Sequence, residues 1–190
     1  LGLPACAGLL LLAAPLIITL FQYDAFSVFA AHQSSLSLMA YGSGLMAFIV
    51  VKILAPVFLA RGDTKTPVKA GVIAMLSNVV LNIIFGYYFD HVGLAAATSI
   101  AAVINAYILY FYLKQQAIFN FSKDLFKMFF KVLAASFIMA IFILNFDQAQ
   151  SVYLEADAFS RISMLATTIC LSVFIYFISL KFLGVNLRKL

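Results

Sequence analysis

Lys52 is the residue whose type and position most directly suggest chemistry. It lies inside a long apolar segment, Ser34–Leu59, and about 10 Å along a helix from that segment's polar end. A charge at such a depth in a membrane costs at least ~2.5–3.5 kcal/mol, so the ammonium either snorkels to the surface or faces a hydrated cavity. The small residues Gly42, Ser43 and Gly44 in the same segment favour the cavity. There, Lys52 would attract an anionic substrate.

A short charged turn follows this segment, with the sequence ARGDTKTPVK over Ala60–Lys69. Its basic side chains could meet a phosphorylated headgroup. Asp63 could cap the next helix, and Pro67 suits the first turn of that helix. A purely structural turn is the alternative. The candidate residues of this motif are Arg61, Asp63, Lys65, Thr66, Pro67 and Lys69.

Four amide and hydroxyl side chains form a second candidate site in the next two apolar segments. Asn78 and Asn82 are four residues apart and share one helix face, and Thr98 and Asn105 follow in the next segment. Hydrogen bonding between the two helices is one interpretation. Binding of a hard cation such as sodium is the other, although neither segment contains a carboxylate.

Other sites find little support in the sequence. The two cysteines, Cys6 and Cys170, lie in apolar runs without Cys or His at metal-ligand spacing, so we interpret them as packing residues. No hydrolase, metalloprotease or phosphate-loop motif is present. We therefore expect no metal, no cofactor and no enzyme activity, and favour a carrier over a catalyst.

The composition indicates that the bilayer is the solvent of this chain. Of its 190 residues, 65% are hydrophobic and 10% charged, with a mean hydropathy of +1.10. Soluble domains are nearer 45–50% apolar and 25% charged. The net charge of +5 is therefore not taken as a sign of nucleic-acid binding. Basic residues instead mark membrane topology, and they can attract anionic headgroups.

The apolar pattern predicts an all-α, polytopic bundle of six transmembrane helices. The connecting segments alternate between basic and acidic, and basic loops stay cytoplasmic, so both chain ends are predicted to be cytoplasmic. The expected spans are Leu1–Leu20, Ser34–Leu59, Ala70–Phe89, Val92–Leu113, Leu125–Phe146 and Arg161–Leu183, with a tight turn at Asp90–His91.

Two parts are expected. The first, residues 1–116, is rich in small residues and would form one bundle, whereas residues 117–190 would be an appended helix pair with bulkier side chains. The chain starts at Leu1 without Met, and its first segment lacks the basic beginning of a signal peptide. We therefore expect it to continue from further helices of a longer protein.

Several motifs resemble the MurJ (MviN) family of lipid II flippases. They are LGLP at Leu1, LFQYDAF at Leu20, VVKILAPVFLARGDTKTPVK over Val50–Lys69, HVGLA at His91 and IN at Ile104. The turn R-x-D-x-K-T-P-V-K after K-x-L-A-P is the most specific of them. The similarity weakens after about Phe121.

This resemblance implies a fourteen-helix protein of the bacterial inner membrane, in the multidrug/oligosaccharidyl-lipid/polysaccharide exporter superfamily. Residues 1–116 would be the last four helices of its second lobe, and residues 117–190 the extra pair beside a groove for a polyprenyl tail. The implied partners are a lipid-linked cell-wall precursor, the phospholipid bilayer and the absent N-terminal helices. Lys52 matches a cavity lysine, whereas Asp24 and Asn82 depart from the family pattern.

Two alternatives remain at this point. One is another carrier of the same superfamily, a polysaccharide-lipid flippase or a drug/cation antiporter. The other is a membrane scaffold that binds cell-wall synthesis partners without transport.

Overall fold

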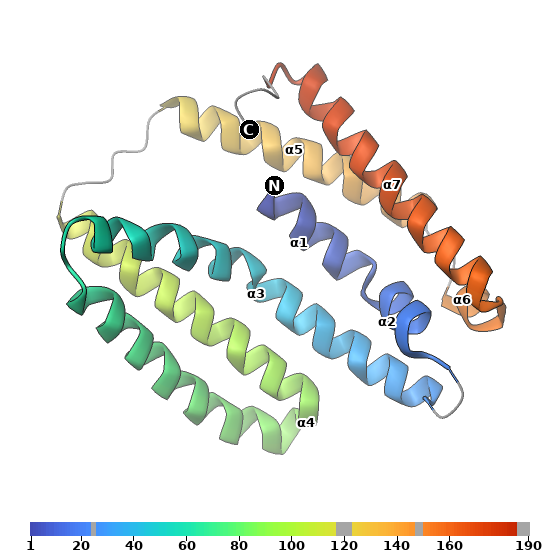
Figure 1. Cartoon of the computed structure of the whole chain (residues 1–190), viewed down its shortest axis with the longest axis horizontal. Coiled ribbons are helices and arrows are strands. Elements are labelled where there is room, and N and C mark those ends of the chain that lie inside the picture. The colour runs from blue at the N-terminus through green and yellow to red at the C-terminus, as the bar shows by residue number, and fades with distance from the viewer. Residues whose placement is uncertain (24–25, 117–122, 147–149, 186–190) are drawn as a thin grey trace. The chain divides into compact units, whose positions relative to one another are not determined.

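The computed structural model describes residues 1–23, 26–116, 123–146 and 150–185 (Figure 1). All of its regular structure in these ranges is helical, as predicted. Four helices are long and apolar enough to cross a membrane, and a bent pair adds a fifth candidate within the described residues. The departure predicted at Asp24 lies outside these ranges. The helices are α1 (Gly2–Leu11), α2 (Ala13–Phe21), α3 (Val28–Ala60), α4 (Lys65–Gln115), α5 (Lys123–Phe146), α6 (Gln150–Glu155) and α7 (Ala158–Phe182).

The first predicted span, Leu1–Leu20, is two helices rather than one. α1 and α2 meet at Leu12 with a bend of 67°. Pro15 explains the break, because it has no N–H to donate to the carbonyl of Leu11 and its ring crowds that carbonyl. Pro15 is tolerated in the first turn of α2, where the N–H would have no helical partner.

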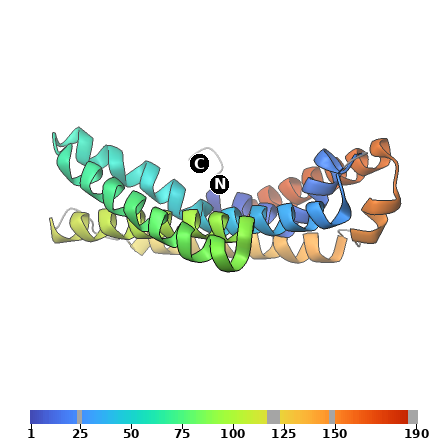
Figure 2. The same ribbon diagram turned by 90° about the horizontal axis from the view of Figure 1, so that it is seen from below.

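The predicted turn at Asp90–His91 is confirmed inside α4. Asp90 has φ 48° and ψ −129°, values that are not helical, and Figures 1 and 2 show α4 folding back on itself at this end. Gly93 is required here, because a Cβ at this position would collide with the carbonyl of Phe85. Just before the turn, Tyr87 and Tyr88 are 83% and 71% exposed. α4 is therefore a hairpin of two helices.

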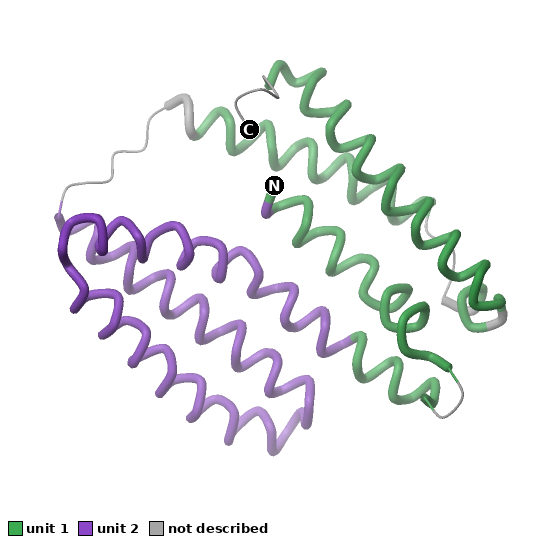
Figure 3. The backbone as a smooth tube through the Cα atoms, viewed as in Figure 1, with its two compact units in different colours: residues 1, 3–35, 121–190 green, residues 2, 36–120 purple. Residues whose placement is uncertain are grey.

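The chain forms two compact units, coloured separately in Figure 3. Unit 1 contains Leu1, Leu3–Ser35 and Phe121–Leu190, and unit 2 contains Gly2 and Leu36–Asn120. Compactness thus groups α1, α2 and the start of α3 with α5–α7. The functional division at Gln116 stays a prediction.

In unit 1, the helix pair α5 and α7 packs partly through small hydroxyl side chains. The packed face of α7 carries the buried hydroxyl residues Thr168, Ser172 and Ser179, while Phe174 and Phe182 on its other faces are exposed. Thr168 and Ser172 donate their hydroxyls to carbonyls four residues earlier in the same helix. These small residues share the packed face with larger buried side chains such as Tyr176 and Leu180, and small residues at helix contacts are typical of packing in lipid.

In unit 2, the core joins α3 to both halves of α4. Leu54 and Phe58 of α3 pack against Ala70 in the first half and Leu109 and Leu113 in the second half. A second contact is a close approach of backbones, since a Cβ on Gly44 would lie 2.7 Å from the Cα of Ser99. The Ser99 hydroxyl donates to the carbonyl of Ala40 at 2.6 Å. Gly44 and Ser99 thus bring the helices into direct contact.

Candidate functional site

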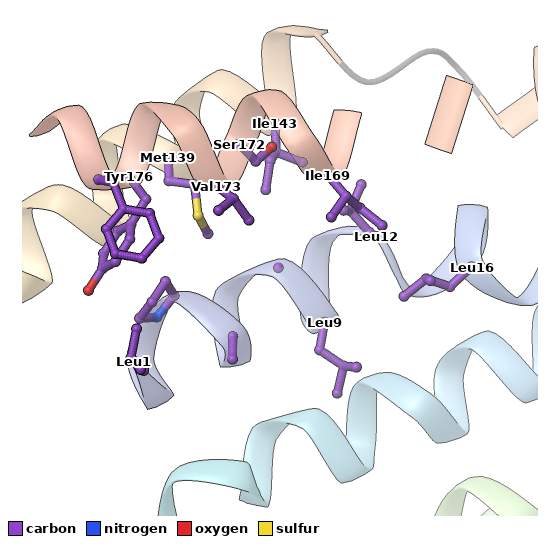
Figure 4. Close-up of a pocket in the computed structure, with 14 residues that line it drawn as sticks. Leu1, Leu9, Leu12, Leu16, Met139, Ile143, Ile169, Ser172, Val173 and Tyr176 are labelled. Atoms are coloured by element: carbon purple, nitrogen blue, oxygen red, sulfur yellow. The ribbon is translucent and has the colours of Figure 1, made fainter. Parts of the chain in front are cut away.

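An apolar pocket of about 450 Å³ lies within unit 1. Helices α1 and α2 form one side of it and helices α5 and α7 the other. Figure 4 shows Met139 and Val173 directed towards α1. The lining residues are Leu1, Pro4, Ala5, Gly8, Leu9, Leu12, Leu16, Met139, Ile143, Ile169, Ser172, Val173, Tyr176 and Phe177. Such a surface can hold a hydrocarbon chain and offers little to a polar ligand.

Two residues of this pocket distinguish it from a simple packing defect. Gly8 has no atom within 4 Å of where its Cβ would be, so the space above it is open. Tyr176 is only 2% exposed, and its buried hydroxyl has no hydrogen-bond partner among the described residues. A buried hydroxyl without a partner costs about 1–3 kcal/mol.

A second recess, of about 320 Å³, lies within unit 2 and is partly polar. Asn78, Thr98 and Asn105 all line it, so the structure brings together three of the four predicted polar residues. Asn82 is outside the lining but donates its amide to the side-chain oxygen of Asn78. The remaining lining residues are Phe48, Val51, Ala74, Met75, Val79, Ala101 and Ala102.

The hydrogen bonding in this cleft differs from the interhelix bonding considered above. Thr98 donates to the carbonyl of Leu94 in its own helix at 2.9 Å. In the described part of the chain, the side-chain oxygens of Asn82 and Asn105 are buried and accept no hydrogen bond. The lining of the cleft therefore includes one free acceptor, the oxygen of Asn105, rather than a closed interhelix network, and a water molecule or a cation could use it.

Lys52 lies on an exposed face of α3, outside both recesses. Its neighbours Ile53 and Leu59 are 61% and 53% exposed, whereas Leu54 and Phe58 point into the core of unit 2. With the described residues, Lys52 forms no hydrogen bond or ion pair. The ammonium is thus accessible to a ligand or to a segment outside this chain. Its role in a cavity stays a prediction.

The charged turn is built as the sequence predicts. Asp63 accepts hydrogen bonds from the backbone N–H groups of Lys65 and Thr66 at 3.1 and 3.0 Å, and from the Thr66 hydroxyl at 2.6 Å. The capping role of Asp63 is confirmed. The hydrogen bond from the Thr66 side chain, followed by that from its backbone, holds the pKa of Asp63 below its ordinary value.

The other motif residues have simpler positions. Pro67 lies in the first turn of α4, where its missing N–H has no cost. Arg61, Lys65 and Lys69 are exposed, so their side chains can reach a membrane surface. Gly62, with φ 76°, ends α3 in a left-handed conformation.

The sequence did not indicate that Gly8 and Tyr176 line an apolar pocket. Nor did it indicate the contact between Ser99 and Ala40. The small residues that allow close packing were visible, but which pair would meet was not. Sequence reasoning also missed Arg161, which was interpreted only as the start of the last span. The guanidinium of Arg161 donates to three backbone carbonyls, and no local pattern in the sequence announces these partners.

The fold and its two recesses define a class, a polytopic membrane protein built from packed helices. The family model described as "Lipid II flippase MurJ" matches residues 1–165. The chain therefore belongs to the MurJ family, which is a family of transporters rather than of catalytic enzymes.

Individual relatives agree with this assignment. The chain is 38% identical over 190 residues to the "Probable lipid II flippase MurJ" of Vibrio cholerae, covering 100% of this chain and 36% of the relative. It is 30% identical over 188 residues to the "Lipid II flippase MurJ" of Burkholderia cenocepacia, covering 97% of this chain and 36% of the relative. This chain thus spans about a third of the length of these relatives.

A solved structure supports the same conclusion. The structure titled "Lipid II flippase MurJ, inward closed conformation" matches with a TM-score of 0.78 and 30% sequence identity, covering 94% of this chain and 35% of the other. Together with the apolar helices, the match makes this chain part of a multi-pass membrane protein.

Proposed function

We propose that the full-length protein moves lipid II, the lipid-linked peptidoglycan precursor, across the bacterial inner membrane by alternating access. The chain supplies part of that carrier. The observation that carries the proposal is similarity along the whole chain to proteins named as lipid II flippases, in both sequence and structure. The transport activity would serve cell-wall synthesis and cell shape.

The proposed topology has six spans with both ends cytoplasmic. The bent pair α1 and α2 would make one span, α3, α5 and α7 one each, and the hairpin α4 two. The length of α4 supports this count, because its 51 residues would extend about 76 Å as one straight helix, more than twice the ~30 Å of hydrocarbon in a bilayer.

The two recesses suit different ligands. The apolar pocket beside α5 and α7 would receive part of the polyprenyl tail. We keep residues 1–116 as the last four helices of the second lobe and residues 117–190 as the appended pair, since α5 and α7 form one wall of this pocket. The polar cleft with Asn78, Thr98 and Asn105 would hold a cation or water.

Lys52 would contribute to holding the pyrophosphate. A buried diphosphate needs compensating cations, and Lys52 is the Lys or Arg of this chain furthest from a span end. Its exposed position on α3 leaves the ammonium free for a ligand. The remaining cations would come from the N-terminal helices outside this chain, and the basic turn would face inner-leaflet headgroups.

The test is leaflet exchange of lipid II by the purified full-length protein in liposomes. Lys52→Ala should slow exchange by about tenfold, because one charge-assisted contact to phosphate is worth roughly 1.5–3 kcal/mol. Lys52→Arg should retain more activity because it keeps the charge. Melting temperatures should be nearly unchanged in both variants, since Lys52 packs against little.

The matched control is Lys114→Ala, which removes an exposed lysine at the end of α4. If Lys52→Ala exchanges lipid II at the wild-type rate, Lys52 does not hold the pyrophosphate, and its ammonium instead snorkels to the membrane surface. Failure of the wild-type protein to exchange lipid II would remove the proposed function itself.

A further inference from the structure

Arg161, in the first turn of α7, donates three hydrogen bonds to backbone carbonyls of unit 1. Its Nε donates to the carbonyl of Ala156 and its Nη2 to the carbonyl of Leu154, both at 2.9 Å. Its Nη1 donates to the carbonyl of Gln22, also at 2.9 Å and 139 residues away in sequence. One planar guanidinium thus joins three segments of the chain.

The three carbonyls belong to helix ends. Gln22 is the C-terminal cap of α2, and Leu154 and Ala156 lie at the C-terminal end of α6. Carbonyls at a helix C-terminus have no partner inside the helix, and they carry the negative end of the helix dipole. The guanidinium of arginine supplies hydrogen-bond donors to these carbonyls and a positive charge to the helix ends. Its donors lie in a fixed plane, unlike those of the compact lysine ammonium.

The position of the charge gives a second, independent reason to look for a role. The sequence has twelve Lys and Arg residues. Under the proposed topology, all except Lys52 and Arg161 lie in cytoplasmic loops, in the cytoplasmic end of the chain or in the first or last turns of a span on its cytoplasmic side, whereas Arg161 lies at the outer end of α7. Basic residues are disfavoured on that side, so Arg161 is placed against the general trend of the chain.

We propose that Arg161 is a positioning residue that locks α2 to α7, so that α1–α2 and the α5–α7 pair move as one body during transport. This inference rests on the proposed flippase function. The arrangement of unit 1 supports it, because α2 packs against both α6 and α7. The apolar pocket is lined by α2 and α7, together with α1 and α5.

The lock has a direct consequence for the pocket. Its two walls are α1–α2 and α5–α7, and their packing alone is apolar and non-directional. Arg161 fixes the outer ends of those walls with directed bonds to the backbone. The width of the pocket is therefore kept constant while other parts of the carrier change conformation.

The first experiment measures the distance between the two walls in the full-length protein. Cys6 and Cys170 are replaced by alanine, and spin labels are placed at Phe21 of α2 and Phe174 of α7, both exposed. Pulsed electron paramagnetic resonance should give one narrow distribution of the distance between the two spin labels when Arg161 is present, with and without lipid II. Arg161→Ala and Arg161→Gln should broaden it, and Arg161→Lys should broaden it less.

The second experiment replaces the lock by a covalent one. A disulfide between facing residues of α2 and α7, with Cα atoms about 5.5–6 Å apart, is introduced into wild type and into Arg161→Ala. Arg161→Ala should exchange lipid II roughly tenfold more slowly than wild type. The disulfide should restore its exchange and leave wild-type exchange unchanged. Ile162→Ala, which changes the exposed neighbour of Arg161, should behave as wild type.

The outcomes separate the lock from the function. A disulfide that stops wild-type exchange shows that α2 and α7 must separate, and overturns the proposal. So does an unchanged distance distribution in Arg161→Ala, or a disulfide that fails to restore its exchange. A wild-type protein that keeps the narrow distribution but exchanges no lipid II supports the lock and rejects the flippase function.

Discussion

The two recesses of this chain are built by opposite means from similar apolar sequence. In unit 1, the pocket is lined almost entirely by hydrocarbon, and the hydroxyls of Thr168 and Ser172 on α7 bond to their own helix. In unit 2, the cleft gathers three polar side chains, and the oxygen of Asn105 accepts no hydrogen bond among the described residues. Hydropathy alone does not distinguish the two regions.

The difference shows that helix contacts decide what a membrane recess can hold. Around Gly8, open apolar space is left. Less than two turns from Ser99, which Gly44 approaches closely, Asn105 borders a smaller, partly polar space. An amphiphilic substrate has a use for both kinds.

The largest effect is expected from disrupting the close contact between Gly44 and Ser99 in unit 2. Gly44→Leu places a Cβ 2.7 Å from the Ser99 Cα, so the helices must separate, and we expect a loss of about 3 kcal/mol or more in stability. Thermal unfolding of the full-length protein in detergent measures this. Gly71→Leu is the matched control, because Gly71 has open space around it. Equal melting temperatures would mean that the close approach is not important for stability.

The next effect tests the pocket of unit 1. Gly8→Leu fills space that is open, so it should slow lipid II exchange by about tenfold, or ~1.4 kcal/mol. Stability should change little. Gly71→Leu again serves as the control, since it adds the same atoms to a helix outside the pocket. Undiminished exchange by Gly8→Leu would show that the tail does not use this pocket.

A smaller effect should separate two amides of the cleft in unit 2. Asn105→Leu removes an oxygen with no hydrogen bond among the described residues, and losing its contact with the proposed water or cation should lower stability by less than about 1 kcal/mol. Asn78→Leu removes the acceptor of the Asn82 amide, and should lower stability by about 1 kcal/mol. Thermal unfolding of the two variants compares them. A gain in stability in Asn105→Leu would contradict the binding of a water molecule or a cation at the Asn105 oxygen.

The smallest effect concerns the turn that starts α4. The pKa of Asp63 is lower in the folded protein than its ordinary value. Its contribution to stability is therefore full above the ordinary pKa and lost as pH falls through the lowered one. Asp63→Asn should flatten the dependence of melting temperature on pH in this acidic range, because it removes the contribution of the carboxylate at pH 7 and changes little below the lowered pKa. An unchanged acid dependence in Asp63→Asn would assign that dependence to other carboxylates.

Much of the fold could be predicted because it depends on local signals. The capping by Asp63 and the turn at Asp90 follow from charged residues between apolar runs, and both are confirmed. The break at Leu12 could have been placed more exactly, since Pro15 removes a hydrogen bond four residues earlier. The short helix α6 lies in a segment interpreted only as an acidic loop.

The sites were harder to predict, because they depend on contacts between distant residues. The shared face of Asn78 and Asn82 was visible from their spacing, but not that Thr98 and Asn105 would line the same cleft as Asn78. Nothing near Arg161 in sequence indicates that the carbonyl of Gln22 is its partner. Such contacts arise only when helices pack.

The aromatic residues beside the α4 turn have a mechanical consequence. Tyrosine rings prefer the boundary between headgroups and hydrocarbon, and resist movement into either phase. In the proposed topology, the exposed rings of Tyr87 and Tyr88 would therefore hold the tip of this hairpin at one depth in the membrane. The hairpin could then tilt about its tip more easily than it could move along the membrane normal, so we expect unit 2 to contribute to the proposed transport by rocking.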